Sequence, residues 1–254
     1  MARTTRPTAD PTRKAAFASG LFYLITFASS IPAALMLAPI LTDPAYIVGP
    51  GADRQIMLAC LLDLVNALTA VGSAVAVFSV IKRHHNGLAL GFVSTRAFEA
   101  ATIVIGIVSL LAVVSIRQAG PAAGTDDASL VAVGQGLVGV RDWTFIIGPS
   151  LMPGFNALMF ATVLYRTRLV PRLIPAMGLV GAPLLIISTA GIILGFNELG
   201  STFSVLATVP IFFWELSVGL WMMFKGFNRN APILADAIEP AMTSGPAAPS
   251  AAAA

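Results

Sequence analysis

Four ionisable side chains lie within stretches of sequence that are apolar enough to cross a bilayer: Asp63, Arg96, Glu99 and Glu215. A charge at the middle of a membrane helix costs about 3 kcal/mol on insertion scales and more than about 10 kcal/mol in simulations. Such residues therefore persist where they have a partner or a function. An arginine and three carboxyls can couple ions or protons to transport, or they can hold a helix bundle together.

Residue spacing predicts which of these charges meet. Arg96 and Glu99 are three positions apart and therefore share one face of a helix. Counting from the ends of the spans places Arg96 and Glu215 at the same depth, so we expect Arg96 to bridge Glu99 on its own helix and Glu215 on the last. Asp63 lies nearer the other side of the membrane, with Asn66 one turn along the same face, and we expect this pair to complete the polar cluster.

The predicted cluster carries an excess of negative charge. Three carboxylates and one guanidinium leave two charges uncompensated if all are ionised, which a low-dielectric interior disfavours. Either some carboxyls hold a proton or a cation binds beside them. We therefore keep two hypotheses: a structural or regulatory protein whose buried charges hold its helices together, and a proton- or ion-linked transporter of small solutes.

The elements that carry these residues are predicted to be six membrane-spanning helices. The 254-residue chain is 57% hydrophobic and only 11% charged, whereas soluble domains carry roughly 25% charged residues. The fold class is therefore all-α, a six-helix transmembrane bundle over residues 15–227, with tails at 1–14 and 228–254 expected to be disordered. The windows that could span a bilayer are 15–41, 55–81, 88–116, 143–165, 172–195 and 203–224.

The distribution of Lys and Arg predicts the orientation. Eleven of these residues fall on the side of the two chain termini, and three, Arg54, Arg117 and Arg141, fall on the other side. By the positive-inside rule both termini are cytoplasmic, and the protein is a multi-pass protein of the cytoplasmic membrane. The basic residues form no stripe, so we expect the lipid bilayer and no nucleic acid as a partner.

Local irregularities concentrate in the fourth window. Pro149 and Pro153 are expected to break or kink its outer half. The preceding segment, within 117–142, is expected to form a short helix lying on the outer membrane interface. Gly178 and Gly181 are expected to allow close helix packing. Further prolines are expected to interrupt the first, fifth and sixth windows: Pro32, Pro183 and Pro210.

No motif of a known enzyme class occurs in the sequence. Zinc-protease, lipase-type and P-loop fingerprints are missing, and Cys60 is the single cysteine, which leaves no disulfide framework. His84 and His85 are adjacent and cannot share a helical face, so we expect no metal site there. We expect no catalytic activity and no cofactor, and the transporter hypothesis favours a homodimer because six spans are few for a transporter.

Several short motifs, in their order and spacing, resemble a bacterial family catalogued as domain of unknown function 4386. They are Arg96-x-x-Glu99, Leu169-Val-Pro-Arg172 before Gly178-Leu-Val-Gly181, and Pro210 followed by Glu215, Trp221 and Lys225-Gly-Phe227. The resemblance runs from about Ala15 to Phe227. It implies a six-span protein of the bacterial inner membrane whose polar centre includes Arg96, Glu99 and Glu215. It implies no known activity, substrate or cofactor.

Overall fold

The computed structural model describes residues 10–120 and 126–235, and within them all regular secondary structure is helical. Six helical runs are long and apolar enough to cross a membrane. The predicted all-α bundle of six spanning helices is therefore confirmed. The elements are α1 (Pro11–Met36), α2 (Ala38–Thr42), α3 (Asp53–Ile81), α4 (Asn86–Ala119), α5 (Asp127–Phe145), the π-helical turn η1 (Ile146–Ser150), α6 (Met152–Thr167), α7 (Leu173–Ile193), α8 (Thr202–Phe224) and α9 (Pro232–Ala235).

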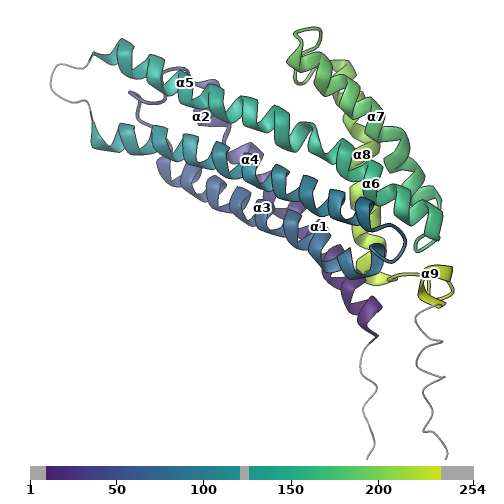
Figure 1. Ribbon diagram of the computed structural model, residues 1–254. Coiled ribbons are helices and arrows are strands. Elements are labelled where there is room, and N and C mark those ends of the chain that lie inside the picture. The colour runs from purple at the N-terminus through teal and green to yellow at the C-terminus, as the bar shows by residue number, and fades with distance from the viewer. Residues whose placement is uncertain (1–9, 121–125, 236–254) are drawn as a thin grey trace, which may run out of the picture.

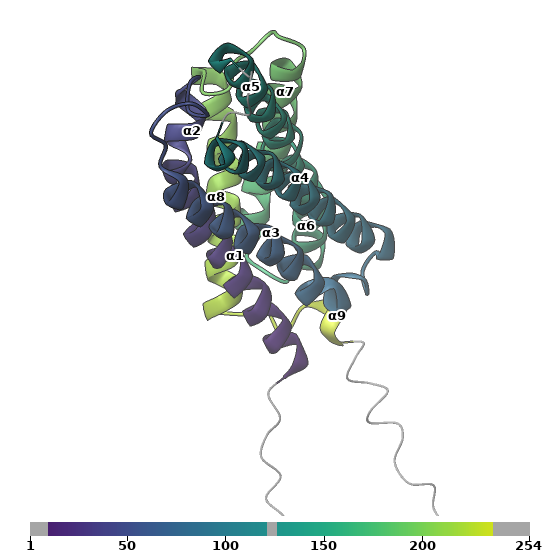
Figure 2. The ribbon, with the colours of Figure 1, turned by 90° about the vertical axis from the view of Figure 1, so that its left-hand side faces the viewer.

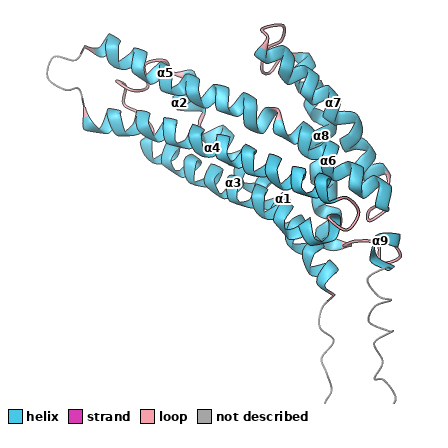
Figure 3. Cartoon of the chain, in the orientation of Figure 1, coloured by secondary structure: helices cyan, strands magenta, loops and turns pink. Residues whose placement is uncertain are grey.

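The spanning helices pack as a closed ring. Going round the ring, α1 packs on α3, α3 on α4, α4 on α6, α6 on α7, α7 on α8 and α8 on α1. The start of α1 and helix α9 lie at one end of the bundle (Figures 1 and 2), which we call the terminal end, and the opposite end is the distal end. Toward the distal end α7 diverges from α4 and α5 (Figure 1), so the ring is widest there. Figure 3 shows that short loops and turns join the helices at both ends.

The fourth predicted span is part of a much longer helical run. Residues Asp127–Thr167 form a helical run of 41 residues, with a turn at Leu151, about 60 Å at 1.5 Å per residue against a hydrocarbon core of about 30 Å. The irregularity expected at Pro149 is present as the π-helical turn η1. The predicted interfacial helix is wrong, because α5 continues into η1 and packs along α4. Leu130 and Leu137 pack against the apolar core of the distal end instead of lying on lipid headgroups.

The distal end has its own small core. Buried side chains from α2, α3 and α4, such as Ile40, Ile56 and Leu110, form it. At its edge the Arg117 guanidinium donates to Asp53 through Nε at 2.7 Å and through Nη2 at 2.6 Å. The Tyr46 hydroxyl donates to Asp53 Oδ1 at 3.1 Å, and burial raises the pKa of Tyr46 to about 12. These contacts connect the 43–52 segment to the ends of α3 and α4.

Small residues allow the helices of the ring to approach closely. A Cβ on Gly20 of α1 would lie 2.4 Å from the Met223 amide nitrogen of α8, and one on Gly178 would lie 2.7 Å from the Trp214 ring. A Cβ on Gly181 would meet the Pro210 ring at 2.8 Å. The packing role predicted for Gly178 and Gly181 is confirmed. Small residues are favoured in this role because lipid tails leave close van der Waals packing as the main attraction between membrane helices.

The remaining prolines do not interrupt their helices as predicted. Pro32, Pro183 and Pro210 lie inside α1, α7 and α8. Membrane helices tolerate proline because neighbouring groups and small local adjustments satisfy the freed carbonyls. The first window, 15–41, does divide, but at Leu37, between α1 and α2.

Parts of both predicted tails are ordered. Helix α1 begins at Pro11, where the Asp10 carboxylate accepts a hydrogen bond from the Thr12 amide at 2.9 Å. After α8, the Asn228 amide donates to the Leu169 carbonyl at 2.8 Å, and Ala231 is buried. The expected disorder at 10–14 and 228–235 is therefore wrong. The rest of both tails, 1–9 and 236–254, and residues 121–125 lie outside the described residues.

Candidate functional site: a charged layer beneath a central cavity

A buried ion-pair layer joins α4 and α8. Arg96 Nη1 lies 3.1 Å from Glu99 Oε2, and Arg96 Nη2 lies 2.5 Å from Glu215 Oε1. Arg96 is only 3% exposed and Glu99 only 6% exposed. The helical spacing of Arg96 and Glu99 and the equal depth of Glu215 place the three together, as the sequence predicted.

A third helix contributes to this layer. Asn156 of α6 donates from Nδ2 to Glu99 Oε2 at 2.7 Å. Glu99 Oε2 therefore accepts from Arg96 and Asn156 together. Asn156 was not predicted to belong to the cluster. The feature of the sequence that could have indicated it is that Asn156 is the single amide side chain in α6, one turn after Pro153.

Aromatic rings close the terminal end below the ion pairs. The Arg96 guanidinium lies 5.0 Å from the centre of the Tyr23 ring and 5.9 Å from that of Phe92. Phe92 stacks on Phe160 with centroids 4.7 Å apart, and Trp214 meets Phe160 edge-on at 6.1 Å. From the directions of α4 and α6, Phe92 and Phe160 lie one turn nearer the terminal end than Arg96 and Asn156. This aromatic layer fills the ring of helices.

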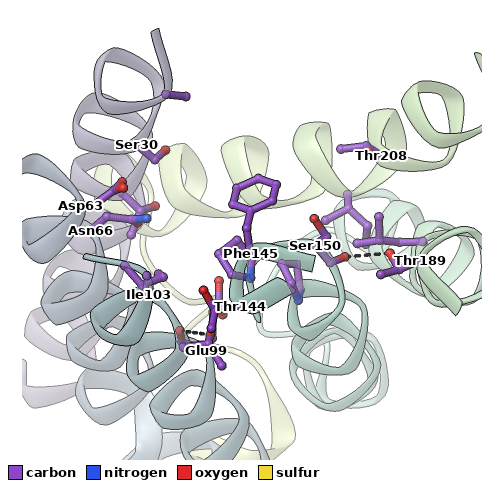
Figure 4. Close-up of a pocket in the computed structure, with 18 of the residues that line it drawn as sticks. Ser30, Asp63, Asn66, Glu99, Ile103, Thr144, Phe145, Ser150, Thr189 and Thr208 are labelled. Atoms are coloured by element: carbon purple, nitrogen blue, oxygen red, sulfur yellow. Dashed lines mark hydrogen bonds between the residues drawn. The ribbon is translucent and has the colours of Figure 1, made fainter. Parts of the chain in front are cut away.

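Above the ion pairs the ring encloses a cavity of about 420 Å³. Arg96, Glu99 and Glu215 line its floor, and its lining extends to Leu199 in the α7–α8 connection at the distal end. Each spanning helical run contributes to the wall. Figure 4 shows side chains from opposite walls pointing into this space. The cavity therefore continues from the middle of the bundle to its distal end.

Asp63 and Asn66 line the cavity but do not join the ion-pair layer. Both lie on the α3 wall, facing Phe145 and, beyond it, Ser150 (Figure 4). Within the described residues, 10–120 and 126–235, the side chains of Asp63 and Asn66 form no hydrogen bond and no ion pair. The residues of the predicted polar cluster therefore form two groups around one cavity. Arg96, Glu99 and Glu215 form ion pairs at its floor, and Asp63 and Asn66 lie on its wall without a partner among the described residues.

A second guanidinium, which was predicted to lie in the outer segment, also lines the cavity. Arg141 of α5 lies 4.6 Å from the centre of the Phe145 ring, and its Nη1 is 3.4 Å from Asp142 Oδ1. Arg141 lies at the cavity because α5 continues directly into η1. Within the described part of the chain no group of three or more His, Cys, Asp or Glu side chains is arranged to hold a metal ion. The lining of the cavity offers charged groups, hydroxyl groups and aromatic faces for contact with a bound molecule.

Comparison with known proteins gives a family and no activity. No curated protein and no solved structure matches the chain. One family model matches residues 18–226, which include every residue of the charged floor and all the spanning helices except the first seven residues of α1. The match covers most of the chain, and the protein therefore belongs to the family described as domain of unknown function (DUF4386).

Proposed function

We propose that this membrane protein binds a small solute in its central cavity and transports it across the membrane. The observation that carries the proposal is the cavity of about 420 Å³ that begins at buried charges in mid-bundle and extends to one end of the helix ring. Small-molecule sites typically have volumes of about 300–1,000 Å³. A bundle that served only to hold its helices together would gain nothing from this space.

The shape of the site fits a transporter with one side closed. On the terminal side the Arg96 ion pairs and the stacked rings of Phe92 and Phe160 fill the ring of helices. On the distal side the cavity reaches the α7–α8 connection. Transport requires that such a layer opens in a second state, while the distal end closes. If both termini are in the cytoplasm, as the distribution of Lys and Arg predicts, the described state faces outward.

The π-helical turn η1 supports the same proposal. Interrupted helices at membrane depth are tolerated where they line a cavity or pack on protein, and π turns are frequent at functional sites. Pro149 and Ser150 of η1 line the cavity, and the Ser150 carbonyl accepts a hydrogen bond from Thr189 of α7 at 3.1 Å. We propose that this turn lets α5 and α6 change their relative tilt.

A structural role is the second candidate, because hydrogen bonds within the Arg96 cluster join side chains of three helices. Glu99 on the same helix, Glu215 of α8 and Asn156 of α6 connect α4 to its neighbours across the ring. If this were the whole function, the protein would stabilise itself or a membrane assembly without moving a solute. The two candidates differ in one measurable property, which is solute flux through the cavity.

Flux can be tested by blocking the cavity. Cys60 is first replaced by Ser, and Thr208→Cys is introduced on the cavity wall. The protein is reconstituted into vesicles with a mixed panel of amines, amino acids, sugars and carboxylates, and uptake is measured before and after reaction with a bulky maleimide. Val209→Cys, next in sequence and 41% exposed outside the cavity lining, is the matched control.

We expect the maleimide to abolish uptake of at least one solute in the Thr208→Cys protein and to leave Val209→Cys unchanged. Unchanged flux of every solute after complete labelling of Thr208→Cys would contradict the transport proposal and leave the structural role. The ring encloses the cavity within one chain, so this experiment does not depend on the homodimer that we predicted from the number of spans.

A further inference from the structure

The charges around the cavity do not balance. Its lining includes three carboxyl groups, on Asp63, Glu99 and Glu215, and two guanidinium groups, on Arg96 and Arg141. With all five ionised, the lining carries one net negative charge. A low-dielectric site of this kind favours a ligand that supplies the missing positive charge.

Uncompensated negative charge lies in two places. Arg96 is bonded to both Glu99 and Glu215, which leaves one net negative charge in that group. Arg141 is close enough to Asp63 to attract it but forms its ion pair with Asp142, at 3.4 Å. Asp63 has no ion pair or hydrogen bond with any group in the described ranges. It lies ten residues into α3, about 15 Å along the helix from its distal start. An unpaired carboxyl at such a depth marks a functional site by default.

We infer that the ligand is an organic cation, an ammonium group on an apolar body, with Asp63 as its counter-ion. This inference rests on the proposed function and names its substrate class. A cavity of about 420 Å³ has room for a small organic molecule and is far larger than a metal ion requires.

The rest of the wall supplies what the apolar body and the cationic head need. Phe27, Phe145 and Phe212 line the cavity, and Phe27 meets Phe212 edge-on at 5.2 Å. Aromatic faces attract cations, as the Arg141 guanidinium over Phe145 already shows in this site. Asn66 stands one helical turn from Asp63 on the same wall (Figure 4), where its amide oxygen can accept a hydrogen bond from an ammonium group.

The test measures binding of benzyltrimethylammonium and tetraphenylphosphonium to the purified protein by equilibrium dialysis. Neopentylbenzene, the uncharged isostere of the first cation, serves as competitor. Wild-type protein is expected to bind at least one cation saturably, with little competition from the isostere. Asp63→Asn should weaken binding about 10- to 100-fold, the usual range for a lost contact to a charged group. Glu198→Gln, which removes an exposed carboxyl outside the lining, should not change it.

Two further variants make the result independent of the folding of Asp63→Asn. Adding Asn66→Asp to Asp63→Asn moves the carboxyl by one turn on the same wall and should restore most of the affinity. Asn66→Asp alone adds a carboxyl to the wall and should tighten binding of the cation. Absence of saturable binding of both cations overturns the inference, as does equal competition by the isostere, wild-type affinity in Asp63→Asn, or no tightening in Asn66→Asp.

The failure of this inference is distinguishable from that of the proposed function. If the maleimide on Thr208→Cys blocks flux of an uncharged or anionic solute while neither cation binds, the protein is a transporter and the ligand class is wrong. If no flux responds to the block, the transport proposal itself fails.

Discussion

Replacement of Arg96 by Met is the perturbation whose cost the structure defines best. Met keeps much of the side-chain volume and removes the guanidinium. Glu99 and Glu215 then face each other without a cation, and their side chains are only 9% and 17% exposed. Removing one partner of a buried ion pair costs about 3–5 kcal/mol because the other charge is left uncompensated. We expect a loss of that size, with the larger share from Glu99 because water in the cavity reaches Glu215 more easily.

Thermal unfolding of the purified protein measures this loss. With Trp143 and Trp221 replaced by Phe, the remaining fluorescence is that of Trp214, which is 1% exposed and reports the packing of this region. A loss of 3–5 kcal/mol corresponds to a decrease in Tm of roughly 6–20 °C for a protein of this size. The triple variant, with Glu99→Gln and Glu215→Gln added to Arg96→Met, should recover most of the loss because no charge is then stranded.

Two results would refute this reasoning. One is an Arg96→Met protein within about 1 kcal/mol of wild type, well below the cost of a broken buried pair. The other is a triple variant no more stable than the single one. The charge exchange Arg96→Glu with Glu215→Arg offers an independent check, since it should accumulate in membranes better than either single change.

The remaining predictions concern packing, pH and topology. Gly20→Ala should lower stability by about 1–3 kcal/mol, since its Cβ would lie 2.4 Å from the backbone of α8. Gly136→Ala, with nothing within 4 Å of the added Cβ, should leave stability unchanged or raise it by up to about 1 kcal/mol. Equal shifts of the unfolding temperature in the two variants would contradict this account. The raised pKa of Tyr46, about 12, means that the folded state holds this proton more tightly than the unfolded state; its stabilising effect is complete below pH 10 and is lost as the pH rises toward 12. Unfolding temperatures measured between pH 9 and 12 should therefore fall more steeply in wild type than in Tyr46→Phe, and parallel curves would count against it. Reporter fusions to the two chain termini should both be active in the cytoplasm, and a periplasmic signal from either one would overturn the proposed orientation.

The sequence alone was sufficient for the spanning helices and for the ion pairs. Helical spacing placed Arg96 and Glu99 on one face, and counting residues from the span ends put Glu215 at the same depth. Both steps depend only on helix geometry and bilayer thickness, which do not change with tertiary context. The close packing at Gly178 and Gly181 was also predictable, because small residues have few other uses at a membrane helix interface.

The cavity and its full lining could not be predicted from the sequence. Arg141 was assigned to an outer segment because it falls between the third and fourth predicted windows, and only the continuation of α5 into η1 brings it to the cavity. Asn156 became a partner of Glu99 through the direction in which α6 leaves the π turn. Asp63 was expected to complete the polar cluster around Arg96, but the divergence of the helices toward the distal end leaves open space between them. These features depend on helix tilt, which short motifs do not specify.

Side-specific labelling of cysteines in oriented membrane vesicles tests most directly whether a water-filled cavity ends at the Arg96 layer. In a Cys60→Ser background, Thr208→Cys on the cavity wall is compared with Ala161→Cys, which is 0% exposed on the terminal side of that layer. A membrane-impermeant thiosulfonate applied from the distal side should modify Thr208→Cys rapidly and leave Ala161→Cys unmodified. Modification of both positions from the distal side, or of neither, would contradict the account.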